Sequence, residues 1–461
     1  MTDSPDVVAL LRAELGDLVD TSPESRDAAR ADKSGHRAAE PPLAVVHAER
    51  VEHVQATLRI ASATGTPVVT RGAGTGCAGG ANAGRGEIAL SVRRMTRVLE
   101  VSPEDLLAVV EPGIINAELN DHLSAYGLWW APDPASRAVS TVGGNIATGA
   151  GGLLCAKYGV VRDAVLGVDV VLADGRLIRM GHRSVKGVTG LDLTSLMIGS
   201  EGRLGVIVGA TLKLRRLVPG DVCTLTATFP SVREAAAGSA AVTASGAQPS
   251  IMELMDAASL AAAYGLLGLV PPTPGASQLA IQTDGPAAVA EAEAIATLLT
   301  SLGASVAVTS DRAEGDRLLA IRRSMHAAME SLGRSLIEDV SVPRSALPAM
   351  FDEIARVEQH YGVTIPTIAH AGDGNLHPNF VFTPDPDAPD EVPAVVWEAA
   401  DDLFRAALRL GGTLTGEHGI GLLKRRWLAD ELGEDQWRLQ RDIVRVFDPR
   451  GILNPGKVFD T

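Results

Sequence analysis

Cysteine is scarce in this chain of 461 residues, which contains only Cys77, Cys155 and Cys223. The three lie far apart and form no C-x-x-C pair, so a four-cysteine iron–sulfur site within the chain is excluded. So few cysteines also indicate a reducing compartment, and we expect a cytoplasmic protein.

Long apolar runs are absent as well. No stretch reaches about 18 uninterrupted apolar residues, which predicts that no segment spans a membrane. The first twenty residues have no basic flank before an apolar run, and they predict an amphipathic helix instead of a targeting signal. Peripheral attachment to a membrane stays open.

Basic residues are in the minority, since 41 Lys and Arg stand against 56 Asp and Glu for a formal net charge of −15. They form no cluster along the chain. Because a nucleic-acid backbone is bound by clustered Lys and Arg, we expect no nucleic-acid partner.

The residues that are present describe a globular protein, with 46% hydrophobic and 21% charged residues. At about 150 residues per domain, the length predicts two or three domains. From about residue 43, β-branched runs alternate with helical patterns, and a hairpin is predicted to turn at Asp174-Gly175. Pro219-Gly220 marks a seam. Beyond it, the order of strands and helices predicts an antiparallel sheet with helices on one face.

The glycine-rich stretch TRGAGTGCAGGANAG, residues 70–84, follows a predicted strand. Glycine permits positive φ and lets main-chain N–H groups turn toward an anion, so such loops hold phosphates. No amphipathic helix follows directly, which argues against a nicotinamide-binding βαβ unit. Two further glycine clusters, at 133–152 and 199–207, indicate that one extended ligand passes along a single domain. A dinucleotide is the obvious candidate.

Several motifs now occur together and in order: RGAGTG, EPG at 111–113, DPAS and STVGGNIA within 133–147, AKYG at 156–159, GSEGRLG at 199–205 and NPGK at 454–457. In these motifs the chain resembles, over about 40–461, the FAD-binding fold of the vanillyl-alcohol oxidase and p-cresol methylhydroxylase (PCMH) superfamily. Its second half resembles the FAD-linked oxidase C-terminal domain of the glycolate oxidase D subunit, the FAD-dependent D-lactate dehydrogenases and the D-2-hydroxyglutarate dehydrogenases.

The resemblance implies an α+β fold in three parts. Residues 40–218 would form a two-subdomain PCMH-type FAD-binding domain, and residues 219–420 an antiparallel-sheet substrate or cap domain. Residues 421–461 would form a C-terminal helical segment that returns to the FAD domain.

The resemblance also implies which residues contact FAD. The first glycine-rich loop would cradle the pyrophosphate, the second cluster would line the flavin, and the third would pass near the adenosine and ribose. The implied contacts are Arg71, Gly72, Ala73, Gly74, Thr75, Gly76, Gly79, Gly80, Pro132, Asp133, Ser136, Thr141, Gly143, Gly144, Asn145, Gly205, Val206, Ile207 and Asn454. Because Thr75 stands where histidine-linked relatives carry a histidine, we expect non-covalent FAD. Arg203 stands where relatives commonly have threonine, so its local contact is left open.

A histidine-rich constellation suggests a metal. His370 and His377 flank a Gly-Asp-Gly-Asn turn between two apolar segments, and a hairpin there would bring both imidazoles to one point. Glu417 and His418, in TGEHGIG, add a carboxylate and a third imidazole. Two histidines and one carboxylate with an open position form a ligand set for a divalent metal such as Zn²⁺.

By resemblance, His370, His377 and Glu417 would bind Zn²⁺ or a similar ion. Asn379 would touch the substrate, and His418 would accept the hydroxyl proton once the metal has lowered its pKa. The hydrogen on the substrate carbon would then leave as hydride to the flavin N5.

The substrate carboxylate needs its own partner, and Arg322 offers a guanidinium that matches it in bidentate fashion. Arg323 competes for this role, and a solvated helix face is the alternative for both. The family resemblance favours Arg322. His326 would share its helix face at i+4.

The sequence favours a small 2-hydroxy acid, D-lactate or glycolate. Dehydrogenases that act on a second, distal carboxylate have a lysine where Ile337 and Glu338 stand here, and Glu338 would repel an acidic tail. D-2-hydroxyglutarate therefore remains the alternative substrate.

Three other readings stay open. A zinc hydrolase would use the same histidines without flavin, and a subunit could carry FAD without turnover of its own. A phenol oxidase of the superfamily is disfavoured because none of the four tyrosines lies near 370–380 or 415–421. Electrons must leave for an external acceptor: oxygen, a quinone, a cytochrome, an electron-transfer flavoprotein or an iron–sulfur subunit. The oligomeric state, a homodimer included, is left open.

Overall fold

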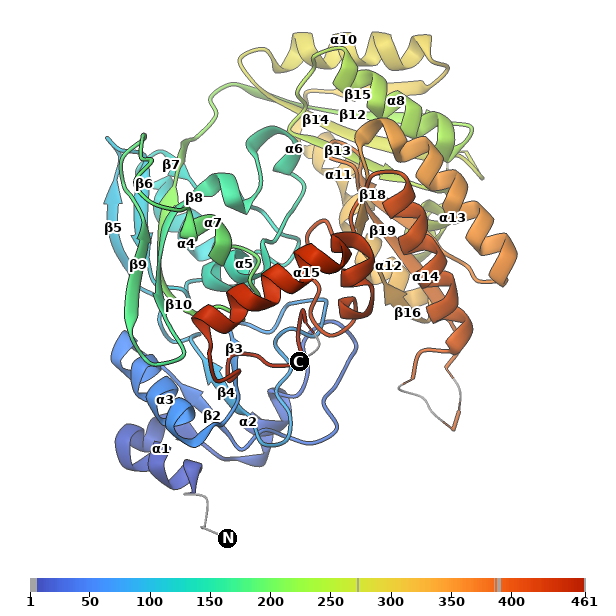
Figure 1. Ribbon diagram of the computed structural model, residues 1–461. Coiled ribbons are helices and arrows are strands. Elements are labelled where there is room, and N and C mark those ends of the chain that lie inside the picture. The colour runs from blue at the N-terminus through green and yellow to red at the C-terminus, as the bar shows by residue number, and fades with distance from the viewer. Residues whose placement is uncertain (1–5, 272, 385, 388–390, 460–461) are drawn as a thin grey trace. The chain divides into compact units, whose positions relative to one another are not determined.

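The computed structural model describes residues 6–271, 273–384, 386–387 and 391–459 (Figure 1). The chain forms two compact units. The first consists of Met1–Gly151, Gly159–Leu217 and Glu417–Thr461, and the second of Gly152–Tyr158 and Val218–Gly416. The break after Leu217 falls two residues before Pro219.

The first unit contains a mainly parallel sheet near the N-terminus. Its strands lie in the order β1 (Val19–Asp20), β2 (Ala44–His47), β4 (Ile88–Ser91) and β3 (Val68–Arg71), with β2, β4 and β3 parallel. Helices α1 (Val7–Leu15), α2 (Pro23–Ala28) and α3 (Val51–Thr64) accompany it. Asp6 caps α1 through its side chain, and Gly65 ends α3 in the left-handed conformation, as the predicted helices require.

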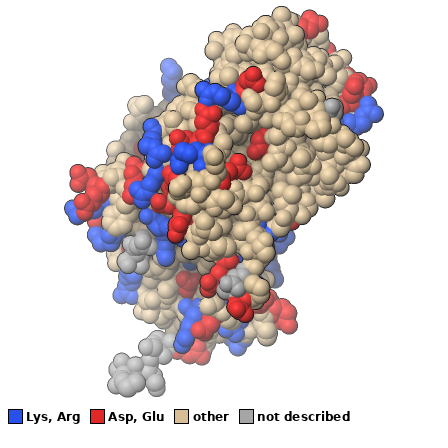
Figure 2. All heavy atoms as spheres, turned by 90° about the vertical axis from the view of Figure 1, so that its right-hand side faces the viewer, with Lys and Arg blue, Asp and Glu red and all other residues tan. Residues whose placement is uncertain are grey.

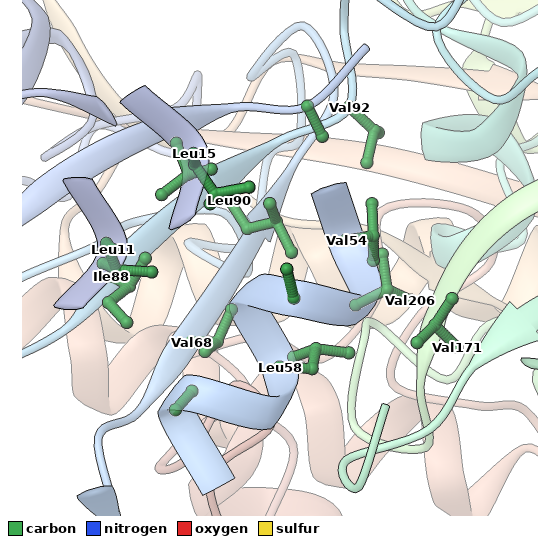
Figure 3. Close-up of a cluster of buried hydrophobic side chains, with 14 of the residues drawn as sticks. Leu11, Leu15, Val54, Leu58, Val68, Ile88, Leu90, Val92, Val171 and Val206 are labelled. Carbon is green, nitrogen blue, oxygen red and sulfur yellow. The ribbon is translucent and has the colours of Figure 1, made fainter. Parts of the chain in front are cut away.

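Apolar side chains from helices and strands meet in one core beside this sheet (Figure 3). Leu11 of α1 and Leu58 of α3 are completely buried there with Ile88 and Leu90 of β4. Burial of such side chains contributes roughly 1.5–3 kcal/mol each. The core therefore holds the strands from which the first glycine-rich loop leaves.

The second sheet of this unit is antiparallel. Its strands lie in the order β5 (Val98–Ser102), β6 (Leu107–Val110), β10 (Val206–Lys213), β8 (Val165–Val171) and β9 (Leu177–Gly181). The predicted hairpin over β8 and β9 is confirmed, with Gly175 at φ +84°. Helices α4 (Asn116–Ser124), α5 (Val142–Thr148) and α7 (Leu193–Met197) and the pair β7 (Leu128–Trp129) with β11 (Arg215–Arg216) complete the region.

The C-terminal segment contacts the first sheet. Helix α15 (Leu428–Phe447) bends at Gly433, which has φ +71°. Beyond the helix, Leu453 pairs with Val68 of β3 in a parallel bridge and is fully buried in the same core.

The second unit is built on one antiparallel sheet. The strands lie in the order β15 (Ser305–Thr309), β12 (Asp221–Phe229), β14 (Ser277–Gly285), β13 (Ile251–Met255), β18 (Thr367–His370), β19 (Asn375–Phe382) and β16 (Arg334–Ile337). The short β17 (Val340–Ser341) also pairs with β19.

Helices cover both faces of this sheet, so the prediction of helices on one face is wrong. On one face, Gly238 of α8 (Val232–Ala244) packs against Phe229 and Leu299 of α10 (Ala288–Ser301). On the other, Gly315 of α11 (Arg312–Arg323) packs against Thr224. Successive residues of a strand point to opposite faces, and β12 is buried on both, which a one-sided sheet would not require.

The remaining helices of this unit are α6 (Cys155–Tyr158), α9 (Ala257–Leu266), α12 (Met325–Leu332), α13 (Leu347–Tyr361) and α14 (Ala394–Arg409). Helices α9, α11 and α12 share an apolar core with strand residues such as Met255 and Ile368. Within the described part of the chain, no helix has the length and apolar character needed to cross a membrane.

Charges on the face drawn in Figure 2 are mixed, with acidic and basic side chains side by side and large areas that carry neither. That face therefore lacks the extended cluster of Lys and Arg that binds the phosphate backbone of a nucleic acid.

Candidate functional site

The first unit contains a large cavity walled by its three glycine-rich loops. The cavity encloses about 1330 Å³ of atom-free space, counted out to its open mouth. Residues from all three glycine-rich loops reach this space, as an extended ligand would require.

Close approach of backbone segments shapes the cavity wall. A Cβ on Gly143 would lie 2.5 Å from Cβ of Pro112, and a Cβ on Gly72 would overlap the Thr141 hydroxyl. The loops can therefore meet only where glycine leaves room. Because main-chain groups then form much of the surface, the wall suits the pyrophosphate of a dinucleotide.

Thirteen of the nineteen residues predicted to contact FAD line this cavity. They are Gly72, Ala73, Gly74, Thr75, Gly76, Gly80, Ser136, Thr141, Gly143, Gly144, Asn145, Gly205 and Ile207. The other six, Arg71, Gly79, Pro132, Asp133, Val206 and Asn454, are not part of its lining.

Two of these six support the wall from behind. The Arg71 guanidinium donates to backbone carbonyls of Ala29, Ala31 and Ala81, and Asn454 Nδ2 donates to the carbonyls of Gly80 and Glu201. Such bonds fix the shape of the glycine-rich loops.

Glu417 and His418, which the sequence analysis grouped with His370 and His377, line the same cavity. Gly151 lies so close to Glu417 that its own Cβ would be 2.9 Å from that of Glu417. His418 Nε2 lies 3.9 Å from Glu417 Oε1. An imidazole and a carboxylate thus face the space that the glycine-rich loops enclose.

Two cavity residues were missed by the sequence analysis. Asp32 comes from the segment before residue 40, and its buried Oδ2 has no hydrogen-bond partner; burial raises the pKa of this carboxyl. Glu201 lies within the quoted GSEGRLG motif, and burial raises its pKa to about 7. The glutamate next to Gly202 in this glycine-rich motif was the available signal for the second residue. No comparable motif marks Asp32.

Arg203, the departure from the family pattern, lies outside the cavity lining. It is buried, with 4% of its surface exposed, and its Nη1 donates to the carbonyl of Leu453 at 2.7 Å. Its pKa is lowered by burial. The cation therefore supports the C-terminal segment and does not face the ligand.

In the second unit, the two histidines come together as predicted. His370 ends β18 and His377 lies in β19, and the hairpin pairing makes them diagonal neighbours on one face of the sheet. Their ring centroids are 5.0 Å apart and both side chains are buried. The two imidazoles therefore converge on one point, as two ligands of the same metal ion would.

Buried carboxylates accompany both rings. His370 Nδ1 lies 2.8 Å from Glu253 Oε1, directly across the sheet on β13, and His377 Nδ1 lies 3.8 Å from Asp339 Oδ1. Ligand histidines are commonly oriented by a carboxylate on the second ring nitrogen, which leaves the other nitrogen for the metal. The donor set therefore fits a divalent ion.

Arg322 joins this network through Glu253. Its Nε and Nη2 each lie 2.7 Å from Glu253 Oε2, and both side chains are largely buried. Burial raises the pKa of Glu253, but the charges of His370 and Arg322 outweigh it, so that the pKa is lowered overall. Arg323, the competing arginine, is exposed and bonds Asp316.

Other predicted residues have mainly structural partners. Asn379 directs both its N–H groups to backbone carbonyls, of Pro366 at 3.2 Å and His377 at 2.8 Å. Glu338 is buried between β16 and β17. The shared helix face proposed for Arg322 and His326 is interrupted, since α11 ends at Arg323, and the His326 side chain lies outside the described residues.

Comparison with known families identifies the class. The sequence model for the FAD linked oxidases, C-terminal domain, matches residues 218–458, and that for the FAD binding domain matches residues 42–181. The chain belongs to the FAD-linked oxidases and is an FAD-linked oxidoreductase. This membership sets aside the zinc hydrolase reading.

Individual relatives are similar over most of their length. The chain is 37% identical to glycolate oxidase subunit GlcD of Bacillus subtilis, across 91% of this chain and 89% of that protein. It is 35% identical to the D-lactate dehydrogenase of Archaeoglobus fulgidus, across 96% and 98%. A solved p-cresol methylhydroxylase matches with a TM-score of 0.78, covering 98% of this chain and 96% of that one, at 18% identity. That likeness shows the PCMH-type fold.

Proposed function

We propose that this protein oxidises a small D-2-hydroxy acid, glycolate or D-lactate, to the 2-oxo acid. The observation that carries the proposal is the placement of Glu417 and His418 on the wall of the FAD cavity, in a chain similar to proteins named glycolate oxidase subunit and D-lactate dehydrogenase. When bound, FAD supplies the acceptor for two electrons and the carbon-bound hydrogen.

His418 is proposed to take the substrate hydroxyl proton on a ring nitrogen. A neutral imidazole is suited to this because its ordinary pKa lies near physiological pH. Glu417 lies beside it and is proposed to belong to the metal set. In this proposal, the loop that places His418 at the cavity also supplies Glu417 as a ligand of the metal.

His370, His377 and Glu417 are proposed to hold the divalent metal, Zn²⁺ or a similar ion. The three are divided between the units, with Glu417 at the first residue of the returning segment. Thr415, two residues before it, bonds Asp339 at 2.5 Å, the carboxylate beside His377. When bound, the ion supplies positive charge that makes a hydroxyl more acidic.

Arg322 is proposed to receive the substrate carboxylate with the guanidinium donors that Glu253 does not occupy. Glu253 fixes the orientation of the guanidinium, which favours a directed, bidentate contact. Asn379 is proposed to hold the His377 backbone and to offer its carbonyl oxygen to the substrate.

The preference for a monoacid is supported by Glu338 and Ile337. Ile337 pairs with Asn379, and the Glu338 amide donates to the carbonyl of Pro378, so both lie beside the strand of His377. A fixed carboxylate there disfavours a substrate with a second carboxylate. D-2-hydroxyglutarate is therefore the less favoured substrate.

We propose that residues 40–218 serve FAD binding and residues 219–420 substrate binding, with 421–461 as the returning segment; within these bounds, residues 417–420 belong to the first unit and residues 152–158 to the second. Electrons are proposed to leave for an external acceptor, among those named above.

The test is anaerobic mixing of the purified protein with glycolate and with the D- and L-forms of lactate and 2-hydroxyglutarate, followed by flavin absorbance. We expect bleaching by glycolate or D-lactate and none by L-lactate. Preincubation with a chelator should abolish the bleaching, and added Zn²⁺ should restore it.

The outcomes separate the two parts of the proposal. Bleaching by D-2-hydroxyglutarate alone would overturn the substrate assignment. Undiminished bleaching after removal of the metal, verified by elemental analysis, would overturn the roles of His370, His377 and Glu417.

A further inference from the structure

We infer that Glu201 is a positioning residue that holds the 417–421 loop, and with it Glu417 and His418, in place on the cavity wall. The catalytic part of this inference rests on the proposed function. Glu201 Oε1 accepts the N–H of Ile420 at 2.7 Å, and Oε2 accepts the N–H of Gly421 at 2.9 Å. Two successive amides thus converge on one carboxylate, an arrangement that binds anions well.

The loop is shaped to make this contact. Gly419 has φ +85° and Gly421 has φ +49°, a backbone region that side chains disfavour. A Cβ on Gly419 would lie 2.9 Å from Glu201 Oε1, and a Cβ on Gly421 would overlap the carbonyl of Ala78. The loop therefore lies pressed between Glu201 and the first glycine-rich loop.

Glu201 is itself held in a strained conformation. Its φ is +50°, which is uncommon for a residue with a side chain. Its N–H donates to the Ala147 carbonyl at 2.8 Å, and its carbonyl accepts Asn454 Nδ2 at 2.7 Å. Strained residues persist where their surroundings fix them, often at functional sites. Loops from three distant parts of the sequence thus meet at this one residue.

The position of the carboxylate explains how it would act. Its carboxylate accepts hydrogen bonds from the loop backbone, one and two residues beyond Gly419, and so it acts on catalysis through His418. A misplacement of about 1 Å in a catalytic group can cost on the order of 100-fold in rate. The carboxylate therefore sets the direction of His418 and Glu417 toward the cavity.

The first test measures amide hydrogen exchange of the holoprotein by mass spectrometry, in wild type and Glu201→Gln. Glutamine would turn an NH₂ group toward one of the two amides, so that one hydrogen bond is lost. We expect faster exchange in the peptide over 417–423 and unchanged exchange in strands β12–β15. Glu358→Gln is the matched control, because Glu358 also accepts a backbone N–H, from Ile365 at 2.7 Å, in the other unit. Wild-type exchange at 417–423 in Glu201→Gln would overturn the inference.

Gly419→Ala gives a second route if Glu201→Gln does not fold. The added methyl pushes on the same carboxylate from the loop side. The same local increase in exchange is expected, and its absence would also count against the inference.

Steady-state kinetics supplies a second readout, because a purely structural role of Glu201 would not lower kcat selectively. We expect Glu201→Gln to retain FAD, to lower kcat by on the order of 100-fold, and to leave KM little changed. Added to His418→Ala, it should cause little further loss, since both remove the same function. Full additivity of the two losses would contradict action through His418. If wild type oxidises no 2-hydroxy acid, the proposed function fails, while the exchange measurement still decides the placement of the loop.

Discussion

At the residue scale, Glu201 and Glu253 show that the groups around a buried glutamate determine its pKa. Burial raises the pKa of both Glu201 and Glu253. At Glu253 the interactions with His370 and Arg322 outweigh burial, and at Glu201 the two amides offset it only in part. Glu253 therefore remains a carboxylate that orients His370 and Arg322, whereas Glu201 titrates near neutrality.

Glu201 makes stability depend on pH. Its pKa rises from 4.5 in the unfolded chain to about 7 in the folded one, so between these values the folded state binds the extra proton. The stabilisation is complete below about pH 4.5 and is lost as pH rises through about 7, by on the order of 3 kcal/mol. Urea unfolding of wild type and Glu201→Gln at about pH 5 and about pH 8 checks this. The mutant should lose less stability over the interval, and equal losses would show that Glu201 does not titrate there.

Glu253→Gln tests the orientation of His370. Removal of the carboxylate leaves a histidine without its orienting partner and a buried arginine without its counter-charge. We expect metal affinity to fall about 10–100-fold, the usual cost of losing such a partner. Zn²⁺ competition with a chromophoric chelator measures it, with flavin absorbance to show that FAD is retained. Unchanged affinity alongside the Glu358→Gln control would remove Glu253 from the site.

At the scale of elements, the β18–β19 hairpin depends on its turn. Gly374 has φ +92°, and a Cβ there would overlap the Val342 carbonyl. Gly374→Ala should therefore cost more than the roughly 1–3 kcal/mol of backbone strain alone, and should reduce bound metal. Gly362→Ala is the control, because Gly362 has φ +65° but open space around it. Thermal unfolding and metal content compare the two, and equal effects would mean that the turn does not position the histidines.

Local patterns predicted many of these elements. The helix of α3, the hairpin of β8 and β9, and the meeting of His370 with His377 follow from periodicity and turn residues that act over short distances. Helices on the second face of the large sheet were missed because threonines alternate with apolar residues along β12, a pattern typical of a strand with one solvent-facing side, whereas threonines such as Thr224 are in fact buried. Asp32 was missed because it reaches the cavity only through tertiary packing.

At the scale of the whole molecule, the first unit is assembled from three separate chain segments, and its cavity takes residues from 32 to 418. Such a site is coupled to the folding of the unit that forms it, since a ligand that binds only the folded state stabilises it by mass action. The returning segment matters most in this respect, because it adds Glu417 and His418 to a wall otherwise made by residues 32–207. We therefore expect FAD binding to make the segment that begins at Glu417 more ordered.

Hydrogen exchange with and without FAD tests this linkage. Protein stripped of FAD and then supplied with about 100 times its Kd should gain about 2.7 kcal/mol in unfolding free energy. Protection should appear in the peptides over 72–80, 141–151, 199–207 and 417–421, which line the cavity, and not in α10 of the other unit. The sequence-distant 417–421 peptide is the decisive one. If FAD protects the first three peptides but leaves it unchanged, then the returning loop does not face the bound cofactor, and His418 is not placed to act beside it.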